Sequence, residues 1–258
     1  MVITGILGYP LKTTFSPLMH NAVFKMLGID GIYLRLPVRK EQLEEAILGL
    51  RALGFRGVNV TIPYKIDILD FLDDIEDKAK AIGSVNTILV RDAKLMGYNT
   101  DAHGFDESLR AHGIDIAGRN IMLIGAGGAA RACAYVLKQK RPRRFFVANR
   151  TLKKSQLISK SFDAEVIEFD QIKKVIRDVD IIFNATSINL QRSIIPLAKS
   201  RAIYYDLNYR FRMVKQKGMK VINGLMMLVE QGAYSFYLWT GKQMPVELVK
   251  RKVGLKND

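Results

Sequence analysis

Short apolar runs alternate with segments whose apolar residues recur at helical spacing. The apolar runs predict buried strands over residues 2–8, 33–38 and 58–62, and a hairpin over 84–90 and 95–98. The helical spacing predicts a helix with Ser16 as its N-cap, Pro17 at its first position and Gly28 at its end, and further helices over 41–53, 65–72, 75–82 and 101–112. Strands that alternate with helices in this way predict a mainly parallel sheet.

The same alternation continues beyond residue 113 and predicts a second, doubly wound α/β unit. Its strands are expected over 120–125, 144–149, 164–167, 179–184, 202–207 and 219–222. Its helices are expected over 128–140, 151–161, 170–177 and 224–241. The helix over 101–112 is the expected connection between the two units.

A glycine turn, Gly125-Ala126-Gly127-Gly128-Ala129-Ala130, joins the strand over 120–125 to the helix over 128–140. This strand–turn–helix pattern is typical of a dinucleotide-binding unit. Gly125 would permit the tight turn, Gly127 would let the backbone approach a pyrophosphate, and Ala130 takes the third motif position. The phosphates would sit on unpaired N–H groups at the helix N-terminus. A tight turn without a ligand is the alternative.

The next strand of this unit ends at Asn149-Arg150-Thr151, where the adenosine ribose is expected. An NAD site would have Asp or Glu here to bond the ribose 2′-hydroxyl, and this segment has neither. Arg150, followed by Lys153 and Lys154, could pair with a 2′-phosphate. The segment therefore favours NADP over NAD, unless these are only exposed residues at a helix start.

Polar residues also follow strands of the first unit: Thr61 and Lys65 after one strand, Asn86 within the next, and Asp101 after a third. Strand ends are where open α/β sheets bind ligands. Each residue has a simpler explanation: Asp101 as a helix N-cap, Lys65 as a solvated lysine, and Asn86 as a bridge between loops.

The 258 residues are 48% apolar and 25% charged, which is typical of a soluble globular protein. The net charge of +15 predicts attraction of anions, either nucleic acid or a phosphorylated cofactor with a small carboxylate substrate. The basic run over 138–144 is interpreted as a solvated loop, because neither interleaved aromatic residues nor a DNA-binding motif accompany it. We therefore expect no nucleic-acid partner.

The single cysteine, Cys133, excludes an internal disulfide and suits a reducing, cytoplasmic compartment. The N-terminal segment predicts a strand rather than a signal peptide, and no apolar run is long enough to cross a bilayer. His20, His103 and His112 are too scattered to predict a metal site.

Taken together, the ordered motifs resemble the shikimate dehydrogenase family over nearly the whole chain. They are Gly8-Tyr9-Pro10, Ser16-Pro17, Asn59 to Lys65, Gly83 to Thr87, Asn99-Thr100-Asp101 with Gly104, the glycine turn, Asn149-Arg150-Thr151, Asn184 to Ser187, Tyr205-Asp206-Leu207 and Gln231-Gly232-Ala233. The resemblance implies NADP-dependent, reversible reduction of 3-dehydroshikimate to shikimate in aromatic amino-acid biosynthesis.

The resemblance also implies a role for each site residue. Lys65 and Asp101 would be the catalytic pair. The substrate would be held by Thr14, Ser16, Thr61, Lys65, Asn86, Asp101, Tyr209 and Gln231. NADP would be held by Gly125, Ala126, Gly127, Gly128, Ala129, Asn149, Arg150, Thr151 and Lys154, with Thr186, Leu207 and Gly232 at the nicotinamide end.

We expect a substrate domain of residues 1–101 with about 225–258, to which the C-terminal helices return, and a Rossmann-type NADP domain of 102–224, in a monomer or homodimer. The chain departs from the family pattern in three segments: Thr14 replaces a serine, Ile188-Asn189 replaces Gly-Met, and Arg210-Phe211 replaces Asn-Pro. Two alternatives stay open. One is a quinate/shikimate dehydrogenase with relaxed cofactor use, and the other is a non-catalytic nucleotide- or nucleic-acid-binding protein.

Overall fold

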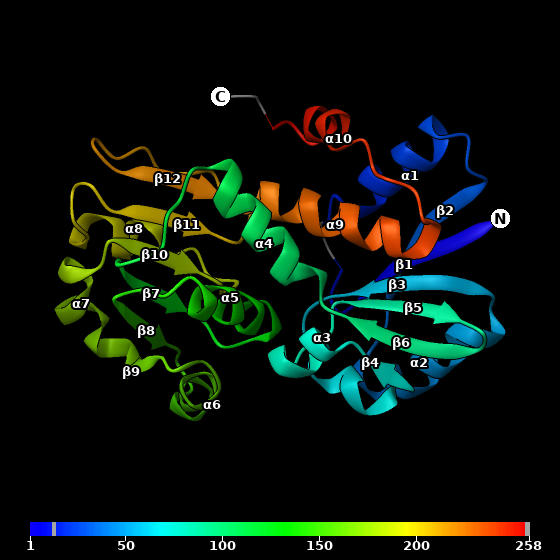
Figure 1. The fold of residues 1–258 in the computed structure, drawn as a ribbon, viewed down its shortest axis with the longest axis horizontal. Helices are drawn as coiled ribbons and strands as arrows, with labels where there is room; N and C mark the ends of the chain where they lie inside the picture. The colour runs from blue at the N-terminus through cyan, green and yellow to red at the C-terminus, as the bar shows by residue number, and fades with distance from the viewer. Residues whose placement is uncertain (12–13, 256–258) are drawn as a thin grey trace. The chain divides into compact units, whose positions relative to one another are not determined.

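The computed structural model describes residues 1–11 and 14–255, which fold into two domains of the α/β class. One compact unit comprises Met1–Gly104 and Leu228–Asp258, and the other comprises Phe105–Met227. The chain passes between them within two helices, α4 (Thr100–Ala111) and α9 (Leu225–Thr240) (Figure 1). The domain bounds expected from the sequence, 101/102 and 224/225, stay predictions, and residues 256–258 lie outside the described part.

The first unit is built on a six-stranded sheet in the order β2-β1-β3-β5-β6-β4 (Figure 1). Its strands are β1 (Val2–Gly8), β2 (Gly31–Pro37), β3 (Phe55–Val60), β4 (Asp74–Ile75), β5 (Thr87–Arg91) and β6 (Lys94–Tyr98). Three neighbouring pairs are parallel, and β5 is antiparallel to both β3 and β6. The expected hairpin is therefore confirmed, and the sheet is mainly parallel.

Helices cover both faces of this sheet. They are α1 (Ser16–Met26), η1 (Lys40–Gln42), α2 (Leu43–Ala52), η2 (Asp67–Phe71), α3 (Asp77–Ile82), α10 (Val246–Lys252) and the second part of α9. Ile47 and Leu50 of α2 pack on Val58 and Val60 of β3 in one core. Trp239 of α9 donates from Nε1 to the carbonyl of Ile88 on β5 at 3.0 Å, which attaches α9 to the sheet.

Several expected elements of the first unit differ in the structure. The helix predicted over 75–82 begins only at Asp77, because Asp74–Ile75 pair with β6 as a strand. The helix predicted over 65–72 is a 3₁₀-helix, η2, and the strand predicted over 58–62 lies at 55–60 as β3. Ser16 is the first residue of α1 rather than its cap, and α10 is one of the expected C-terminal helices, for which no residue range was predicted. The interstrand hydrogen bonds that define β4 form only on folding, so local spacing cannot reveal them.

The second unit contains a fully parallel six-stranded sheet in the order β12-β11-β10-β7-β8-β9 (Figure 1). This is the strand order of a dinucleotide-binding Rossmann domain. Its strands are β7 (Asn120–Ile124), β8 (Arg144–Ala148), β9 (Glu165–Ile167), β10 (Ile181–Asn184), β11 (Ile203–Asp206) and β12 (Lys220–Asn223). Successive strands are added outward from β7 on one side of the sheet and from β10 on the other, so the strand order changes direction between β7 and β10.

Helices lie on both faces of this sheet, as in a doubly wound fold. They are α5 (Gly128–Gln139), α6 (Leu152–Phe162), η3 (Phe169–Gln171), α7 (Ile172–Val175), η4 (Ile176–Asp178), α8 (Gln191–Ile194), η5 (Ile195–Leu197) and the second part of α4. Met122 and Ile182 pack on the α7 side, whereas Phe183 and Tyr205 contact Phe105 of α4 on the other. The helix predicted over 170–177 is broken into three short turns, and α8 was not predicted.

Candidate active site

Lys65 and Asp101 form a direct ion pair in the first unit. The Lys65 Nζ atom lies 2.5 Å from Asp101 Oδ2, with side chains that are 14% and 6% exposed. Lys65 follows β3, and Asp101 is the second residue of α4. Asn99 caps this helix, because its Oδ1 accepts a hydrogen bond from the N–H of Ala102 at 3.1 Å. Asp101 is therefore free to pair with the lysine rather than to serve as the N-cap.

Asn86 holds the other oxygen of the Asp101 carboxylate. Its Nδ2 donates to Asp101 Oδ1 at 2.8 Å, and its Oδ1 accepts from the backbone N–H of Thr100 at 2.7 Å. The same Nδ2 lies 3.3 Å from Gln231 Oε1 on α9. Lys65, Asn86, Asp101 and Gln231, predicted from four separate segments, thus meet at one place.

Two of the expected substrate contacts lie near the start of α1. The Thr14 and Ser16 hydroxyl oxygens are 3.2 Å apart, and both residues are buried. Thr61 directly follows β3, where its N–H donates to the carbonyl of Leu7 at 2.9 Å. Tyr209 follows β11 in the second unit. Their contacts with substrate stay predictions.

The glycine turn has the backbone that its sequence predicts. Gly125 adopts φ +120°, a conformation that L-residues rarely occupy, and a Cβ there would lie 2.9 Å from the carbonyl oxygen of Ala185. Gly127 has φ −84°, and no atom lies within 4 Å of the position that its Cβ would take. The three-turn helix α5 begins at the next residue, so its unpaired N–H groups follow this open stretch of backbone.

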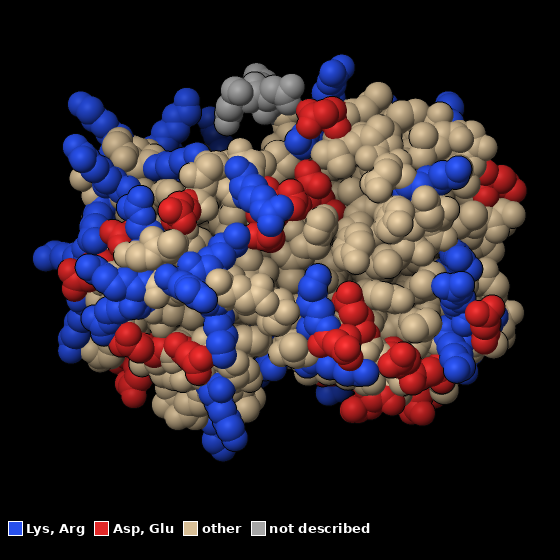
Figure 2. Space-filling model, in the orientation of Figure 1, with Lys and Arg blue, Asp and Glu red and all other residues tan. Residues whose placement is uncertain are grey.

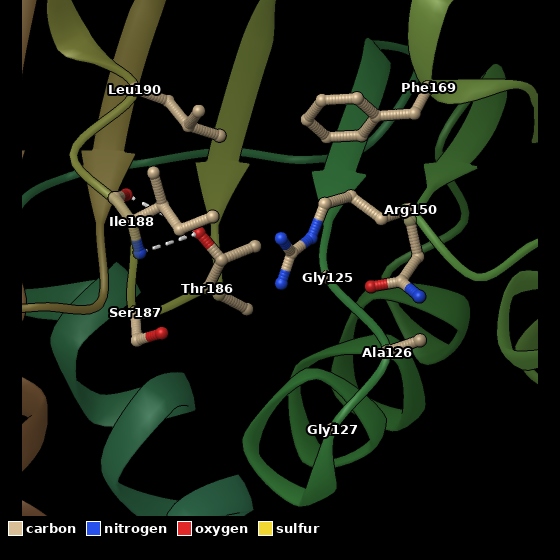
Figure 3. Close-up of a pocket in the computed structure, with 11 residues that line it drawn as sticks. Gly125, Ala126, Gly127, Arg150, Phe169, Thr186, Ser187, Ile188 and Leu190 are labelled. Carbon is tan, nitrogen blue, oxygen red and sulfur yellow. Dashed lines mark hydrogen bonds between the residues drawn. The ribbon is translucent and has the colours of Figure 1, made fainter.

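A pocket of about 160 Å³ opens beside this turn at the C-terminal ends of β7, β8 and β10 (Figure 3). The pocket is lined by Gly125, Ala126, Gly127, Asn149, Arg150, Phe169, Ala185, Thr186, Ser187, Ile188 and Leu190. Figure 3 shows the guanidinium of Arg150 extending into the pocket toward the loop that carries Thr186 and Ile188. The pocket therefore combines a cation, an apolar wall and open backbone at a helix start.

These features fit a phosphorylated dinucleotide. The backbone at Gly127 leaves room for a pyrophosphate, and a Cβ at this residue would occupy that room. Arg150 offers a guanidinium that can pair with a 2′-phosphate, and no lining residue carries a carboxylate that would repel it. The donor set is therefore better suited to NADP than to NAD.

Other predicted cofactor residues are placed differently. Gly128 and Ala129 form the first turn of α5, and Thr151 and Lys154 lie at the start of α6, beside the pocket residues in sequence but outside its lining. Leu207 follows β11 at the same edge of the sheet. Gly232 belongs to α9 in the first unit, where a Cβ would lie 3.0 Å from Met19 Cε. The cofactor contacts of these residues stay predictions.

The loop that departs from the family pattern is held by Asn184 at the end of β10. Its Nδ2 donates to the carbonyl of Ile188 at 2.9 Å and to Asp206 Oδ2 at 3.1 Å. Burial raises the pKa of the Asp206 carboxyl, which also accepts from the N–H of Asn208. Asn208 Oδ1 in turn accepts from Arg210 through both its backbone N–H and its Nε. The loops that contain Ile188 and Arg210 are thus held by several hydrogen bonds, although both residues depart from the family pattern.

Sequence reasoning missed two groups of residues. Phe169, Ile188 and Leu190 supply the apolar wall of the pocket, and no motif marked Phe169 or Leu190. Thr87, Thr100 and Ser235 lie directly behind Asn86, bonded to it or to one another. Ser235 follows Gln231 by one helical turn, so their spacing places both on one face of α9.

Within the described ranges, no helix is both long and apolar enough to cross a membrane. The same residues contain no cluster of His, Cys, Asp or Glu arranged to hold a metal ion.

Three family models match consecutive parts of the chain. The shikimate dehydrogenase substrate binding domain matches residues 6–88, and the shikimate / quinate 5-dehydrogenase model matches 108–200. The shikimate 5′-dehydrogenase C-terminal domain matches 224–253. The matches cover both units and the helices that return to the first one.

Relatives and solved structures agree with these matches. Shikimate dehydrogenase (NADP(+)) of Carboxydothermus hydrogenoformans is 40% identical over 98% of this chain and 96% of its own. The crystal structure of shikimate dehydrogenase from Aquifex aeolicus has a TM-score of 0.89 at 34% identity, with 98% of each chain covered. The Thermus thermophilus enzyme, solved in complex with NADP(H) and shikimate, has a TM-score of 0.87 at 33% identity, again over 98% of each chain. With all three domain models, its relatives and its fold in agreement, the chain belongs to the shikimate dehydrogenase family.

Proposed function

We propose that the protein is an NADP-dependent oxidoreductase that reversibly reduces 3-dehydroshikimate to shikimate, within aromatic amino-acid biosynthesis. The observation that carries the proposal is the Lys65–Asp101 ion pair at 2.5 Å, braced by Asn86, in a chain that also contains the glycine turn and Arg150. A non-catalytic nucleotide-binding protein would need the turn and Arg150 but not the buried pair.

The proposed chemistry follows from the charge of the lysine. NADPH, when bound, supplies the hydride that adds to the carbonyl carbon of the substrate. The carbonyl oxygen then gains negative charge, which the ammonium of Lys65 stabilises and neutralises by donating a proton. In the reverse direction, the same lysine takes the proton from the substrate hydroxyl. The step balances, because one hydride and one proton convert a ketone into an alcohol.

Asp101 is proposed to orient the lysine and to contact the reacting hydroxyl. Its Oδ2 binds Lys65, and its Oδ1 is occupied by Asn86, so the carboxylate is held at both oxygens. Thr14, Ser16, Thr61, Asn86, Tyr209 and Gln231 are proposed to bind the substrate carboxylate and hydroxyls, and the pocket of the second domain is proposed to bind NADP. The first domain thus contains the proposed substrate residues except Tyr209, and the second contains the pocket proposed for NADP.

We further propose that the protein acts in the cytoplasm as a monomer or homodimer, without a nucleic-acid partner. The proposal is supported by the single, buried cysteine, which suits a reducing compartment.

Nicotinamide absorbance tests the activity directly. The purified protein is mixed with shikimate or quinate and with NADP⁺ or NAD⁺, in all four combinations. Shikimate with NADP⁺ is expected to give the highest kcat/KM, because Arg150 can pair with a 2′-phosphate. Comparable turnover of quinate, or with NAD⁺, would instead support the broader quinate/shikimate activity. No turnover in any combination would reject the dehydrogenase.

Lys65→Ala tests the proposed role of the lysine. It is expected to lower kcat about 100-fold or more, because it removes both the proton donor and the positive charge. Lys94→Ala is the control, since Lys94 is an exposed lysine of the same unit, and its kcat should match that of the unsubstituted protein. If Lys65→Ala keeps kcat within a few-fold of the unsubstituted protein and changes only KM for shikimate, the lysine does not perform the chemical step.

A further inference from the structure

Three buried hydroxyl groups form a closed triangle behind the catalytic pair. They belong to Thr87 at the start of β5, Thr100 at the start of α4, and Ser235 on α9. Their oxygens are separated by 3.1 Å (Thr87–Thr100), 2.9 Å (Thr87–Ser235) and 3.1 Å (Thr100–Ser235). All three residues are fully buried. We refer to Thr87, Thr100 and Ser235 as the hydroxyl triangle.

Each hydroxyl has one proton and two lone pairs, so the three groups must share donors and acceptors. Asn59 supplies protons from outside, because its Nδ2 donates to Ser235 Oγ at 2.9 Å and to Thr87 Oγ1 at 3.0 Å. Ser235 can donate to the carbonyl of Gln231 at 2.9 Å. The hydroxyl protons of Thr87 and Thr100 can therefore be donated either to another member of the triangle or to an acceptor outside it.

Asn86, which contacts the catalytic pair, provides an acceptor outside the triangle. Its Oδ1 lies 3.2 Å from both Thr87 Oγ1 and Thr100 Oγ1, and it also accepts from the N–H of Thr100 at 2.7 Å. Thr100 Oγ1 lies closer to the other end of the amide, 3.0 Å from Asn86 Nδ2, from which it can accept a hydrogen bond. The Thr100 N–H and the Thr87 hydroxyl are therefore the two donors that converge on the oxygen end of this side-chain amide. The NH₂ end is thereby turned toward Asp101 Oδ1, at 2.8 Å. A flipped amide would place its NH₂ group against these donors and its oxygen against a carboxylate.

We propose that the hydroxyl triangle positions the catalytic pair by fixing the orientation of the Asn86 amide. The amide then donates to one oxygen of Asp101, which leaves the other oxygen on Lys65. The three hydroxyls are positioning residues, because they act through Asn86. The inference rests on the proposed function, in which Lys65 and Asp101 carry out the proton transfer.

Ser235 is the member of the hydroxyl triangle that connects it to α9. It lies one turn after Gln231, whose Oε1 is 3.3 Å from Asn86 Nδ2 and 3.4 Å from Thr100 Oγ1. The triangle therefore joins β5 and α4 to α9, which is far from both in the sequence, at the residue that holds the catalytic carboxylate.

The competing explanation is that these side chains only fill space in the core. Two substitutions at Thr100 distinguish this packing role from the positioning role. Thr100→Val keeps the volume and removes the hydroxyl, whereas Thr100→Ser keeps the hydroxyl and removes a methyl group. If the hydroxyl positions the pair, Thr100→Ser has the higher kcat/KM for shikimate. If the residue only fills space, Thr100→Val has the higher value.

Ser235→Ala provides a second test in a residue that does not touch Asn86. Its control is Ser84→Ala, because Ser84 is equally buried in the same unit and its hydroxyl has no hydrogen-bond partner among the residues described by the structure. For each variant, kcat, KM for shikimate, KM for NADP⁺ and the thermal unfolding midpoint are measured, with activity assayed well below that midpoint.

The expected result is that Ser235→Ala and Thr100→Val each lower kcat/KM for shikimate about ten-fold, the effect of one buried hydrogen bond on a transition state. KM for NADP⁺ should stay within about two-fold, and Thr100→Ser and Ser84→Ala should retain most of the activity. Equal effects of Ser235→Ala and Ser84→Ala, or higher activity in Thr100→Val than in Thr100→Ser, would overturn the proposal. If Thr100→Val does not fold, the two serine variants decide the question. Absence of turnover in the unsubstituted protein would reject the proposed function, and with it the purpose assigned to the triangle.

Discussion

His20 shows how strongly the interior of the first domain can perturb a single residue. Its ring stacks on Tyr33 at 4.3 Å with an interplanar angle of 2°, and Phe236 and Trp239 of α9 lie around it. Neither ring nitrogen has a hydrogen-bond partner within residues 1–11 and 14–255. Burial lowers the pKa of His20 from 6.5 to about 3, so the folded protein holds this ring neutral.

We predict that His20 makes the fold sensitive to acid. Because the unfolded chain binds the proton more readily than the folded one, stability falls as the pH decreases from about 6.5 toward 3. The contribution approaches about 1.4 kcal/mol of unfolding free energy per pH unit within that window. Urea unfolding at several pH values should show a shallower dependence for His20→Phe, which keeps an aromatic ring against Tyr33. Parallel pH curves for the two proteins would contradict this prediction.

At the residue scale, the chemistry-bearing side chains were predictable, whereas most of their supporting contacts were not. Lys65, Asn86 and Asp101 stand at strand ends within recognisable motifs, so their types and positions already indicated a site. Thr87 and Thr100 lie within two of the family motifs, but the resemblance assigned them no role. Ser235 could not be linked to them, because its partner Thr87 is separated from it by 148 positions in the chain.

At the scale of elements, the β7–α5 turn illustrates two different demands on glycine. Gly125 is required by its backbone, since φ +120° and the nearby Ala185 carbonyl exclude a side chain. Gly127 has an ordinary backbone, and a Cβ there would meet no atom of the described protein within 4 Å. One glycine therefore serves the fold, and the other is proposed to serve binding.

Alanine substitutions should separate these two demands. Gly125→Ala is expected to lower the unfolding free energy by about 1–3 kcal/mol, because the residue must adopt a strained conformation. Gly127→Ala is expected to leave the thermal unfolding midpoint nearly unchanged while it raises KM for NADP⁺ several-fold. Thermal unfolding and steady-state kinetics of both variants check this. If Gly127→Ala binds NADP⁺ normally, the pyrophosphate does not lie against this backbone.

Helices and strands that have a clear apolar periodicity in the sequence were predicted well. Elements that depend on hydrogen bonds to distant segments were not. The strands and helices from β7 to α6 lie within one or two residues of their expected positions. The two-residue strand β4 was not predicted, and its second residue, Ile75, was assigned to a helix, because an apolar pattern cannot show that this backbone pairs with β6. The four-residue helix α8 was missed for a related reason: Gln191 within it is held by the backbone N–H of Val214.

At the scale of the whole molecule, the positive charge is distributed unevenly. Residues 105–227 contain 23 of the 40 Lys and Arg but only 10 of the 25 Asp and Glu, a net charge of +13 against +2 for the other unit. Figure 2 shows Lys and Arg side chains crowded over the region of the second domain. The domain proposed to bind a polyanionic cofactor therefore carries nearly all the excess charge.

We predict that this charge promotes association of NADP⁺ and makes it sensitive to salt. Raising the ionic strength from about 0.01 M to about 0.15 M shortens the screening length from about 30 Å to about 8 Å, so KM for NADP⁺ should rise several-fold. KM for shikimate, which carries one carboxylate, should change less and serves as the control. Equal salt dependence of the two KM values would show that the charge of the second domain does not favour the cofactor.

The sequence by itself determined the α/β class, the glycine turn and the preference for NADP, because these depend on local periodicity and on residue type at strand ends. Its resemblance to a known family implied Lys65 and Asp101 as the catalytic pair. Only the tertiary structure decided how Lys65 and Asp101 pair, which way the Asn86 amide faces and where α9 packs. These are contacts between segments distant in the chain. Their geometry arises when burial and hydrogen bonding are satisfied together, which no local pattern records.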